Sequence, residues 1–406
     1  MTSEAETASQ GTAVPAPWLD PEMLAENPMP GQWAWLLHGK AEPTTLEHLL
    51  KHLARGPGKT QWSGRPENAP VGIVASPDYP RVLPAAECAP LQDAILAYEK
   101  EIHLENRRKN AMVFYPLAVA CVLLVANGMG HSTLLLIGAF FALTTGTAHA
   151  EAWLALNRLR ADPRRYLRAL GAQIRYAVWL TIPRTQYLCR TCWMVGIWVV
   201  IYLLQMYVEN RAGPSHRADL AAAALVKSLV ATEPWRLLTA EMLHGGLLHI
   251  YMNVMAMFSL GMILERSVHR FLVVPVWLGG ALAGSLLSWA FMPTTSLGAS
   301  GGIVSVFGFL LVMGWRRRAL LPPDFLHGLL QSLVAIALLG ILAWGIIDNF
   351  AHLGGLLFGV TAGIWVFRER QGTLPLRDSV PRTMIGLAAD AAFLVTALFT
   401  AWKLLA

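Results

Sequence analysis

The stretch "LGASGGIVSVFGFLLVMGWRRR", from Leu297 to Arg318, places the hydroxyl of Ser300 between small residues at the start of an apolar segment that ends on three arginines. The segment is long enough to cross a bilayer as a helix, and arginines are retained on the cytoplasmic side of a membrane. Ser300 is therefore predicted at the outer end of a transmembrane helix. By itself a G-x-S-G sequence is weak evidence for catalysis, because small residues are common wherever transmembrane helices pack closely.

The composition predicts a polytopic membrane protein. Of the 406 residues, 55% are hydrophobic and only 14% are charged, which is too apolar for a soluble protein that must cover its surface with charge. The net charge of +6 does not indicate a nucleic-acid partner, because the arginines fall in short runs between apolar segments, as they do in cytoplasmic loops. The lipid bilayer is therefore the expected environment.

Nine stretches are apolar and long enough to span a bilayer, given about 17–25 residues per helix. They are 111–127, 131–150, 192–208, 246–264, 271–291, 299–315, 325–346, 349–367 and 383–404. Arginine-rich flanks occur at every second boundary, which predicts that the amino terminus lies inside and the carboxyl terminus outside.

The same pattern divides the chain into a small soluble region, two transmembrane helices with a basic cytosolic loop, six further spans, and a linker with a last span. These parts are 1–108, 109–190, 191–370 and 371–406. The soluble region contains two helix candidates, Thr45–Arg55 and Leu91–Arg107. Part of the 151–190 loop could lie as amphipathic helices on the inner membrane surface. The start of the chain has no apolar core, so no cleaved targeting segment is expected.

Polar side chains occur near the outer ends of three spans. His249 and Asn253 are four residues apart on the span that begins near Gly246, so they share one helix face and can point at one place. Polar side chains inside a transmembrane span cost free energy of insertion and usually face the interior of the helix bundle, which favours a functional site for this pair. The alternative for this pair is a hydrogen bond that holds two helices together.

Ser300 and His352 are the candidate nucleophile and general base. At the start of a helix, Ser300 would lie beside unpaired N–H groups and the positive end of the helix dipole. His352 is followed by Gly355, Gly359 and Gly363, and a glycine stripe lets a neighbouring helix approach closely. Acyl transfer would then use Ser300, His352 as its base, and oxyanion donors from the Ser300 amide, His249 and Asn253.

No third catalytic carboxylate and no metal are expected. Asp348 lies four residues before His352 and should sit about one turn above the imidazole, so a Ser–His dyad is predicted. Cys189 and Cys192 form one C-x-x-C pair, whereas a zinc site needs about four ligands. The sequence therefore predicts chemistry without a cofactor.

These motifs resemble those of the rhomboid family of intramembrane serine proteases over roughly 190–370. The matching positions, in the family's order, are Trp235, Arg236, His244, His249, Asn253, Gly298, Ser300, Gly301, Ala351, His352, Gly355 and Gly359. The resemblance implies an all-α polytopic fold with a six-helix core. The two transmembrane helices expected before this core are unlike the family's usual layout; one further span is expected after the core, and a soluble region at the amino terminus. It implies cleavage of membrane-protein substrates within or near a transmembrane segment, in a cavity open to the outer face. It further implies an interfacial loop at Trp235-Arg236, a structural role for Glu265 and access gated near the fifth core helix.

Some positions depart from the family's pattern or stay unassigned. Many relatives carry an aromatic residue where this chain has Val304, so the imidazole of His352 is expected to be held less firmly. Asp390 lies inside the last span and is expected to face protein. Two alternatives to a protease are a rhomboid-fold pseudoprotease that binds membrane clients, and a transporter whose histidines relay protons. The signal-free start and the arginine pattern suit a bacterial cytoplasmic membrane, and the oligomeric state is not readable.

Overall fold

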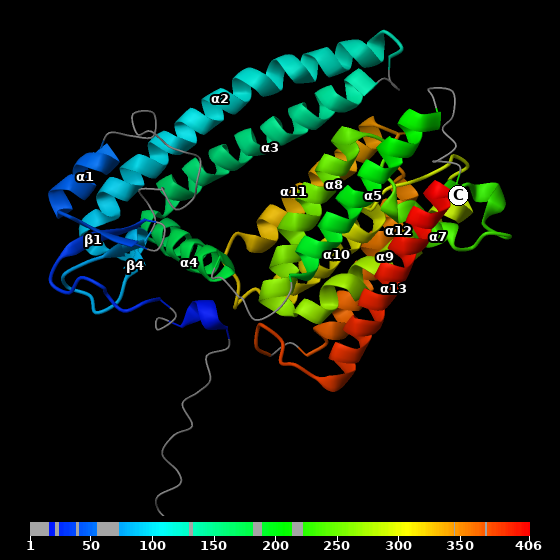
Figure 1. The fold of residues 1–406 in the computed structure, drawn as a ribbon. Coiled ribbons are helices and arrows are strands. Elements are labelled where there is room, and N and C mark those ends of the chain that lie inside the picture. Colours follow the sequence, from blue (N-terminus) through cyan, green and yellow to red (C-terminus); the bar gives the residue numbers. More distant parts are fainter. Residues whose placement is uncertain are drawn as a thin grey trace, which may run out of the picture. The chain divides into compact units, whose positions relative to one another are not determined.

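The computed structural model describes residues 16–20, 24–37, 40–54, 73–129, 133–181, 189–212, 222–344, 346–369 and 372–406. Most of the amino-terminal stretch interpreted above as free of a targeting segment lies outside these residues. The chain forms two compact units. Unit 1 comprises Met1–Ile182 with Ala319–Phe325, and unit 2 comprises Pro183–Arg318 with Leu326–Ala406. The chain is predominantly helical, which confirms the predicted all-α polytopic class (Figure 1).

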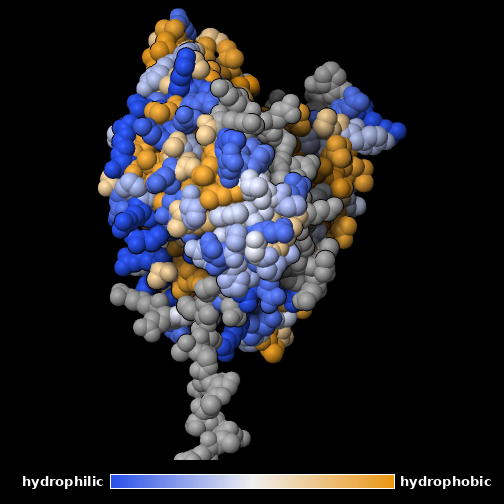
Figure 2. All heavy atoms as spheres, turned by 90° about the vertical axis from the view of Figure 1, so that its left-hand side faces the viewer, coloured by the Kyte–Doolittle hydropathy of each residue, from blue (hydrophilic) through white to orange (hydrophobic). Residues whose placement is uncertain are grey.

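Unit 1 also contains a small antiparallel sheet that the sequence did not predict. Its strands, in the spatial order β2-β1-β3-β4, are β1 (Trp33–Leu37), β2 (Lys40–Thr44), β3 (Ile73–Ala75) and β4 (Leu83–Pro84). Helix α1 (Leu46–Ala54) follows β2 and buries Leu49 and Leu53 in a cluster with Val74 and Leu83 of the sheet. Figure 2, viewed from the side on which α1 and the sheet lie in Figure 1, shows mostly hydrophilic side chains on this face.

The predicted helix Leu91–Arg107 and the predicted span 111–127 are one continuous helix, α2 (Gln92–Ala126). It pairs with α3 (Thr133–Ala161) in a long hairpin, in which the two helices run side by side (Figure 1). At about 1.5 Å per residue, the 35 residues of α2 extend over about 52 Å, which exceeds the roughly 30 Å of hydrocarbon that a span must cross. The expected boundary at residue 108 therefore falls inside one helix.

Helix α4 (Pro163–Thr181) packs its apolar side within unit 1. Leu167 is buried in the cluster that α1 and α2 also line, and Leu170 and Ile174 pack against it. This apolar side of α4 is therefore covered by protein, and the expected placement of part of the 151–190 loop on the membrane surface stays a prediction. Three short 3-10 turns complete the unit: Pro17–Leu19, Ala85–Glu87 and Ala89–Leu91.

Unit 1 also includes the segment Ala319–Phe325, which connects the serine-bearing helix to the next one. Asp324 of this segment pairs with Arg158 of α3 at 2.6 Å and accepts a hydrogen bond from Gln173 of α4 at 3.2 Å. The ring of Phe325 lies edge-on to Tyr176, with 6.0 Å between their centroids. The connection is thus held by side chains of α3 and α4.

Unit 2 contains the remaining helices. They are α5 (Arg190–Ala212), α7 (Arg236–Thr239), α8 (Leu247–Ile263), α9 (Val273–Phe291), α10 (Ser300–Arg316), α11 (Phe325–Leu342), α12 (Asn349–Val366) and α13 (Val380–Leu405). Short turns occur at Lys227–Leu229, Ala240–Met242, Leu264–Val268 and Arg270–Leu272. Helix α10 packs against both α9 and α12, and most of its side chains are buried.

Seven helices among the described residues are long and apolar enough to cross a membrane. They are Ala89–Ala126, Arg190–Arg211, Leu247–Val268, Arg270–Phe291, Phe325–Leu342, Asn349–Val366 and Val380–Leu405. Helix α10 is apolar but has only 17 residues. Helix α3, which contains the expected span 131–150, is not among the seven, so its crossing stays a prediction.

Two acidic residues that the sequence left without partners have them in the structure. Glu265 accepts hydrogen bonds from the backbone N–H groups of Arg190 and Thr191, both at 3.0 Å, and from the Thr191 hydroxyl at 2.9 Å. The carboxylate of Asp390 on α13 pairs with the guanidinium of Arg190 at 2.9 Å. The first turn of α5 is thereby tied to the turn Leu264–Val268 that follows α8 and to α13. Cys189 and Cys192, on either side of this first turn's start, are joined as a disulfide.

Asp390→Ala is expected to destabilise the protein by about 3–5 kcal/mol, because it leaves the guanidinium of Arg190 in a largely buried place without its carboxylate. The measurement is unfolding in detergent by heat or denaturant. Glu47→Ala is the control, since Glu47 pairs with Lys51 where both side chains are exposed, and an exposed pair contributes about 1 kcal/mol or less. Equal losses in the two variants would show that the Arg190–Asp390 pair has no special weight.

Candidate active site

The side chains of Ser300 and His352 meet in unit 2. His352 Nε2 lies 2.9 Å from Ser300 Oγ, within hydrogen-bond distance, and both residues are half-buried. Ser300 is the first residue of α10, so it lies among the N–H groups that a helix start leaves unpaired. A serine hydroxyl in contact with an imidazole, beside such donors, is the arrangement that nucleophilic acyl transfer requires.

Glycines bring the two helices into backbone contact at this point. A Cβ atom added to Gly355 of α12 would lie 1.9 Å from the carbonyl oxygen of Gly301 of α10. One turn further along, a Cβ atom on Gly359 would lie 1.9 Å from the carbonyl oxygen of Ser305. No other residue type fits such an approach, and the distance between Ser300 and His352 therefore depends on these glycines.

His249 lies against the turn that precedes Ser300. Gly298 has a φ of +123°, and a Cβ atom there would lie 2.6 Å from the His249 ring. The glycine thus supplies both a backbone conformation that other residues rarely adopt and the space that the imidazole occupies. Asn253 is buried, and its side-chain amide donates to the His249 carbonyl of its own helix at 3.0 Å. The structure therefore brings His249 to the serine turn and directs one Asn253 donor to the backbone.

His244 is a buried ring that packs against the rings of His249 and Trp198. The centroids of the His244 and His249 rings are 5.3 Å apart, and burial lowers the pKa of His244 to about 3, so this ring is neutral. Gln205 of α5 clamps its backbone, accepting from the His244 N–H at 3.2 Å and donating to the His244 carbonyl at 2.9 Å. The sequence did not single out Gln205, because a lone glutamine in an apolar span carries no motif.

Trp235 and Arg236 stabilise the loop that precedes α8. The Arg236 side chain is 4% exposed and donates to the Ala224 carbonyl at 2.7 Å. Trp235 packs edge-on against Phe399 of α13, with 5.3 Å between centroids, and the Lys403 ammonium lies 4.8 Å from its ring. Helix α13 is thereby attached to the loop that precedes α8.

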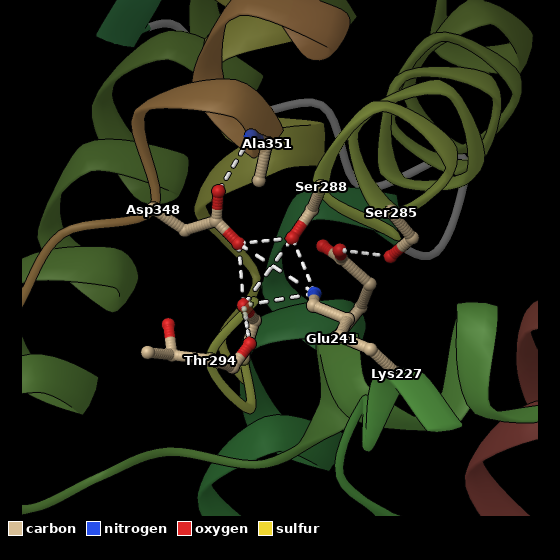
Figure 3. Close-up of polar contacts among 8 residues, drawn as sticks. Lys227, Glu241, Ser285, Ser288, Thr294, Asp348 and Ala351 are labelled. Atoms are coloured by element: carbon tan, nitrogen blue, oxygen red, sulfur yellow. Dashed lines mark hydrogen bonds and ion pairs between the residues drawn. The ribbon is translucent and has the colours of Figure 1, made fainter. Parts of the chain in front are cut away.

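Asp348 organises a polar cluster at the start of α12. Its Oδ1 accepts from the Ala351 N–H at 2.9 Å and caps the helix that carries His352. Its Oδ2 accepts from the hydroxyls of Ser288 and Ser296, with the Lys227 ammonium 4.0 Å away. Figure 3 shows Asp348 facing Ser288 and Lys227. These partners could not be predicted from the sequence, because they come from separate segments and share no motif.

Glu241 is a buried acid near the start of α10. Its Oε1 accepts from the Ser285 hydroxyl at 2.9 Å (Figure 3), and a Cβ atom on Gly301 would lie 3.6 Å from the same oxygen. Burial raises the pKa of Glu241 to about 8, although the Ser285 hydrogen bond opposes the shift. The folded protein therefore holds a proton at neutral pH that the unfolded chain releases above about 4.5.

The free energy of unfolding is consequently expected to fall as the pH rises through the window that ends near 8, by up to about 1.4 kcal/mol per pH unit. Between pH 6.5 and 8 the Glu241 carboxyl makes the largest contribution to the change of unfolding free energy with pH. His244, with its lowered pKa, contributes only below its ordinary value of 6.5, and Lys227, whose burial lowers its pKa to about 8, contributes an opposite slope only above that pH. Glu241→Gln should flatten the profile of melting temperature against pH in detergent. An unchanged slope in this variant would contradict the assignment.

Helix α10 is shorter than a hydrocarbon core is thick. Its 17 residues extend over about 25 Å, less than the roughly 30 Å of a hydrocarbon core.

A sequence profile of the rhomboid domain matches residues 231–369, which include Trp235, both members of the Ser300–His352 pair and Gly359. The chain is a member of the rhomboid family. The profile leaves out most of unit 1, α5 and α13. The part of the chain shared with other rhomboids is thus the part that holds the two catalytic candidates.

Curated rhomboid relatives come from bacteria, plants and animals. The Rhomboid protease GluP of Bacillus subtilis (strain 168) is 31% identical over 198 residues, covering 47% of this chain and 38% of the relative. RHOMBOID-like protein 6, mitochondrial, of Arabidopsis thaliana is 33% identical over 177 residues, covering 41% of this chain and 56% of the relative. Rhomboid-related protein 2 of Mus musculus is 34% identical over 183 residues, covering 41% of this chain and 58% of the relative. The chain therefore spans between 38% and 58% of the length of these relatives.

Proposed function

We propose that this rhomboid is an intramembrane serine endopeptidase that cleaves transmembrane segments of membrane proteins with a Ser300–His352 dyad. The observation that supports this best is the 2.9 Å approach of His352 Nε2 to Ser300 Oγ on two helices in backbone contact. The Ser300 N–H and the imidazole of His249 are the proposed oxyanion donors, with Asn253 supplying its second amide hydrogen. Catalysis is assigned to 191–370, and no cofactor takes part.

In the proposed reaction, His352 Nε2 takes the Ser300 hydroxyl proton while Oγ attacks the carbonyl carbon of the scissile bond. The negative charge that develops on the carbonyl oxygen is stabilised by the donors at the start of α10. Collapse of this tetrahedral intermediate breaks the C–N bond, and His352 returns the proton to the leaving amine. Water then hydrolyses the acyl-Ser300 ester by the same steps.

Substrate is proposed to approach beside α11, the fifth helix of the core. Leu329 and Gly340 are the only buried residues of α11, and α11 is the least buried of the core's candidate spans. Moving α11 aside would therefore break fewer packing contacts than moving another of these helices. The arginines at the end of α10 favour an orientation with the amino terminus in the cytoplasm and the dyad toward the outer face, in a multi-pass protein of a bacterial inner membrane.

The test is cleavage of a helix-destabilised transmembrane substrate by the purified protein, together with labelling by a fluorophosphonate. Cleavage and labelling together support the proposal. Labelling without cleavage supports the dyad and assigns the missing step to substrate recognition. Neither cleavage nor labelling would overturn the proposal in favour of a pseudoprotease that binds membrane clients through the same fold.

A further inference from the structure

Unit 1 contains a cavity of about 520 Å³ that the proposed protease reaction does not use. It is lined by Ala86, Glu87, Gln92, Arg164, Leu167, Arg168 and Arg175. All of these residues belong to unit 1, so the cavity lies within one compact body. Its volume is in the range of sites that bind small molecules, about 300–1,000 Å³.

The lining is strongly basic. Arg164, Arg168 and Arg175 project from one face of α4, because they are spaced by four and seven residues. Glu87 is the single acid of the lining, and it pairs with Arg175 at 2.7 Å. A Cβ atom on Gly171, between the last two arginines, would lie 2.4 Å from Glu87, so the glycine is what lets this carboxylate approach α4.

Two of the three arginines have no counter-charge from the protein. In the part of the chain that the structure describes, Arg164 and Arg168 are exposed and form no ion pair. Two like charges four residues apart on a helix repel each other, which makes the pair unfavourable unless an anion is present. Arg175 also has a buried Nε atom with no hydrogen-bond partner among the described residues. The cavity therefore presents guanidinium donors that nothing on the chain satisfies.

Glu87, the single acid of the lining, does not neutralise the three arginines of the cavity. Its carboxylate is already paired with Arg175 at 2.7 Å, which leaves Arg164 and Arg168 without an acidic partner in the lining. Burial raises the pKa of Glu87, and Arg175 opposes the shift. Asp162 is also nearby in sequence, but its carboxylate caps α4 by accepting from the Arg165 N–H at 2.9 Å and does not line the cavity. The cavity thus keeps a net positive charge.

We propose that this cavity binds a phosphate-bearing anion, held by the guanidinium groups of Arg164 and Arg168. Arginine matches phosphate oxygens with two parallel N–H bonds, and the Leu167 side chain between them supplies an apolar wall for the rest of an organic phosphate. Such a ligand would replace the missing counter-charge and satisfy the exposed donors.

The source of the phosphate is a solute rather than a lipid headgroup. Gln92 of the cavity and Met112, where the apolar surface of α2 begins, are 20 residues apart on one helix. At about 1.5 Å per residue this separation is about 30 Å, which places the cavity well away from the membrane that α2 enters. A headgroup at the membrane surface would not reach it unless α2 lay nearly flat.

The test is a calorimetric titration of the full-length protein in a phosphate-free detergent with inorganic pyrophosphate at constant ionic strength. We expect saturable binding that Arg164→Gln/Arg168→Gln weakens at least about tenfold. Arg160→Gln/Arg165→Gln is the matched control, since it removes the same charge from exposed arginines outside the lining and should bind as the wild type does. Melting temperatures without ligand verify that both double variants fold.

A second titration distinguishes the two sources of phosphate. It compares vesicles of phosphatidylglycerol with vesicles of phosphatidylcholine, using the protein in nanodiscs. Binding of pyrophosphate lost only in the cavity variant supports a solute, and binding of phosphatidylglycerol alone, lost only in that variant, supports a phosphate headgroup in the same cavity. Absence of saturable binding to either, or equal losses in both double variants, would overturn the proposal. Because the readout is binding, its failure is distinct from failure of the proposed protease reaction.

Discussion

Ser300→Ala and His352→Ala are each expected to lower the rate of substrate cleavage by about 10³-fold or more, to below detection. The first variant removes the attacking oxygen, and the second removes the base that lies 2.9 Å from it. Both side chains are half-buried and share one hydrogen bond, so the melting temperature should change little, in line with about 0.5–1.5 kcal/mol for such a bond. In-gel cleavage and unfolding in detergent measure the two effects separately.

Ser332→Ala is the matched control for the serine variant. Its hydroxyl donates to the Gly328 carbonyl within α11 at 2.9 Å, and it lies on a different helix from the dyad. It should cut and label at the wild-type rate. Fluorophosphonate labelling should be lost completely in Ser300→Ala and strongly reduced in His352→Ala. Cleavage that persists in Ser300→Ala would assign the nucleophile to another residue or to a contaminating protease.

The elements that sequence analysis located are those with a local signal. Ser300 and His352 each stand in a short motif of small residues, and the structure places their side chains in contact. The class of fold followed from composition, because long apolar segments have few alternatives to transmembrane helices. The glycine pattern of α12 similarly pointed to a close helix contact, and Gly355 and Gly359 lie at that contact.

Features that depend on contacts between residues far apart in the chain could not be predicted from the sequence. β3 has three residues and β4 two, whereas alternation over about four to eight residues is needed to predict a strand. The ion pair between Arg190 and Asp390 joins residues 200 positions apart, and no spacing rule connects them. α2 was predicted as two elements because its composition changes from polar to apolar near residue 110, but the helix continues through that change and through Pro116.

Gly355→Ala is expected to lower the rate of cleavage by at least about 10²-fold, although the variant keeps both Ser300 and His352. Its new Cβ atom would meet the Gly301 carbonyl oxygen at 1.9 Å, whereas ordinary contacts are 3.4 Å or longer. The two groups that meet are both backbone, so the clash can be relieved only if α10 and α12 separate, and not by rotation of a side chain. Ser300 adjoins Gly301, and His352 lies one turn before Gly355, so the separation opens the dyad. A misplacement of about 1 Å can cost 10²-fold in rate.

Gly196→Ala and Gly328→Ala are the matched controls, because a Cβ atom at either helical position meets nothing within 4 Å. Both should retain activity and gain slightly in stability, since alanine is favoured over glycine in a helix by roughly 0.5–1 kcal/mol. Gly355→Ala should instead destabilise the protein by about 1–3 kcal/mol, as overpacking does. Its fluorophosphonate labelling should fall together with cleavage, because the reactivity of Ser300 itself depends on His352. Wild-type activity in Gly355→Ala would mean that the two helices are not in backbone contact when the enzyme reacts.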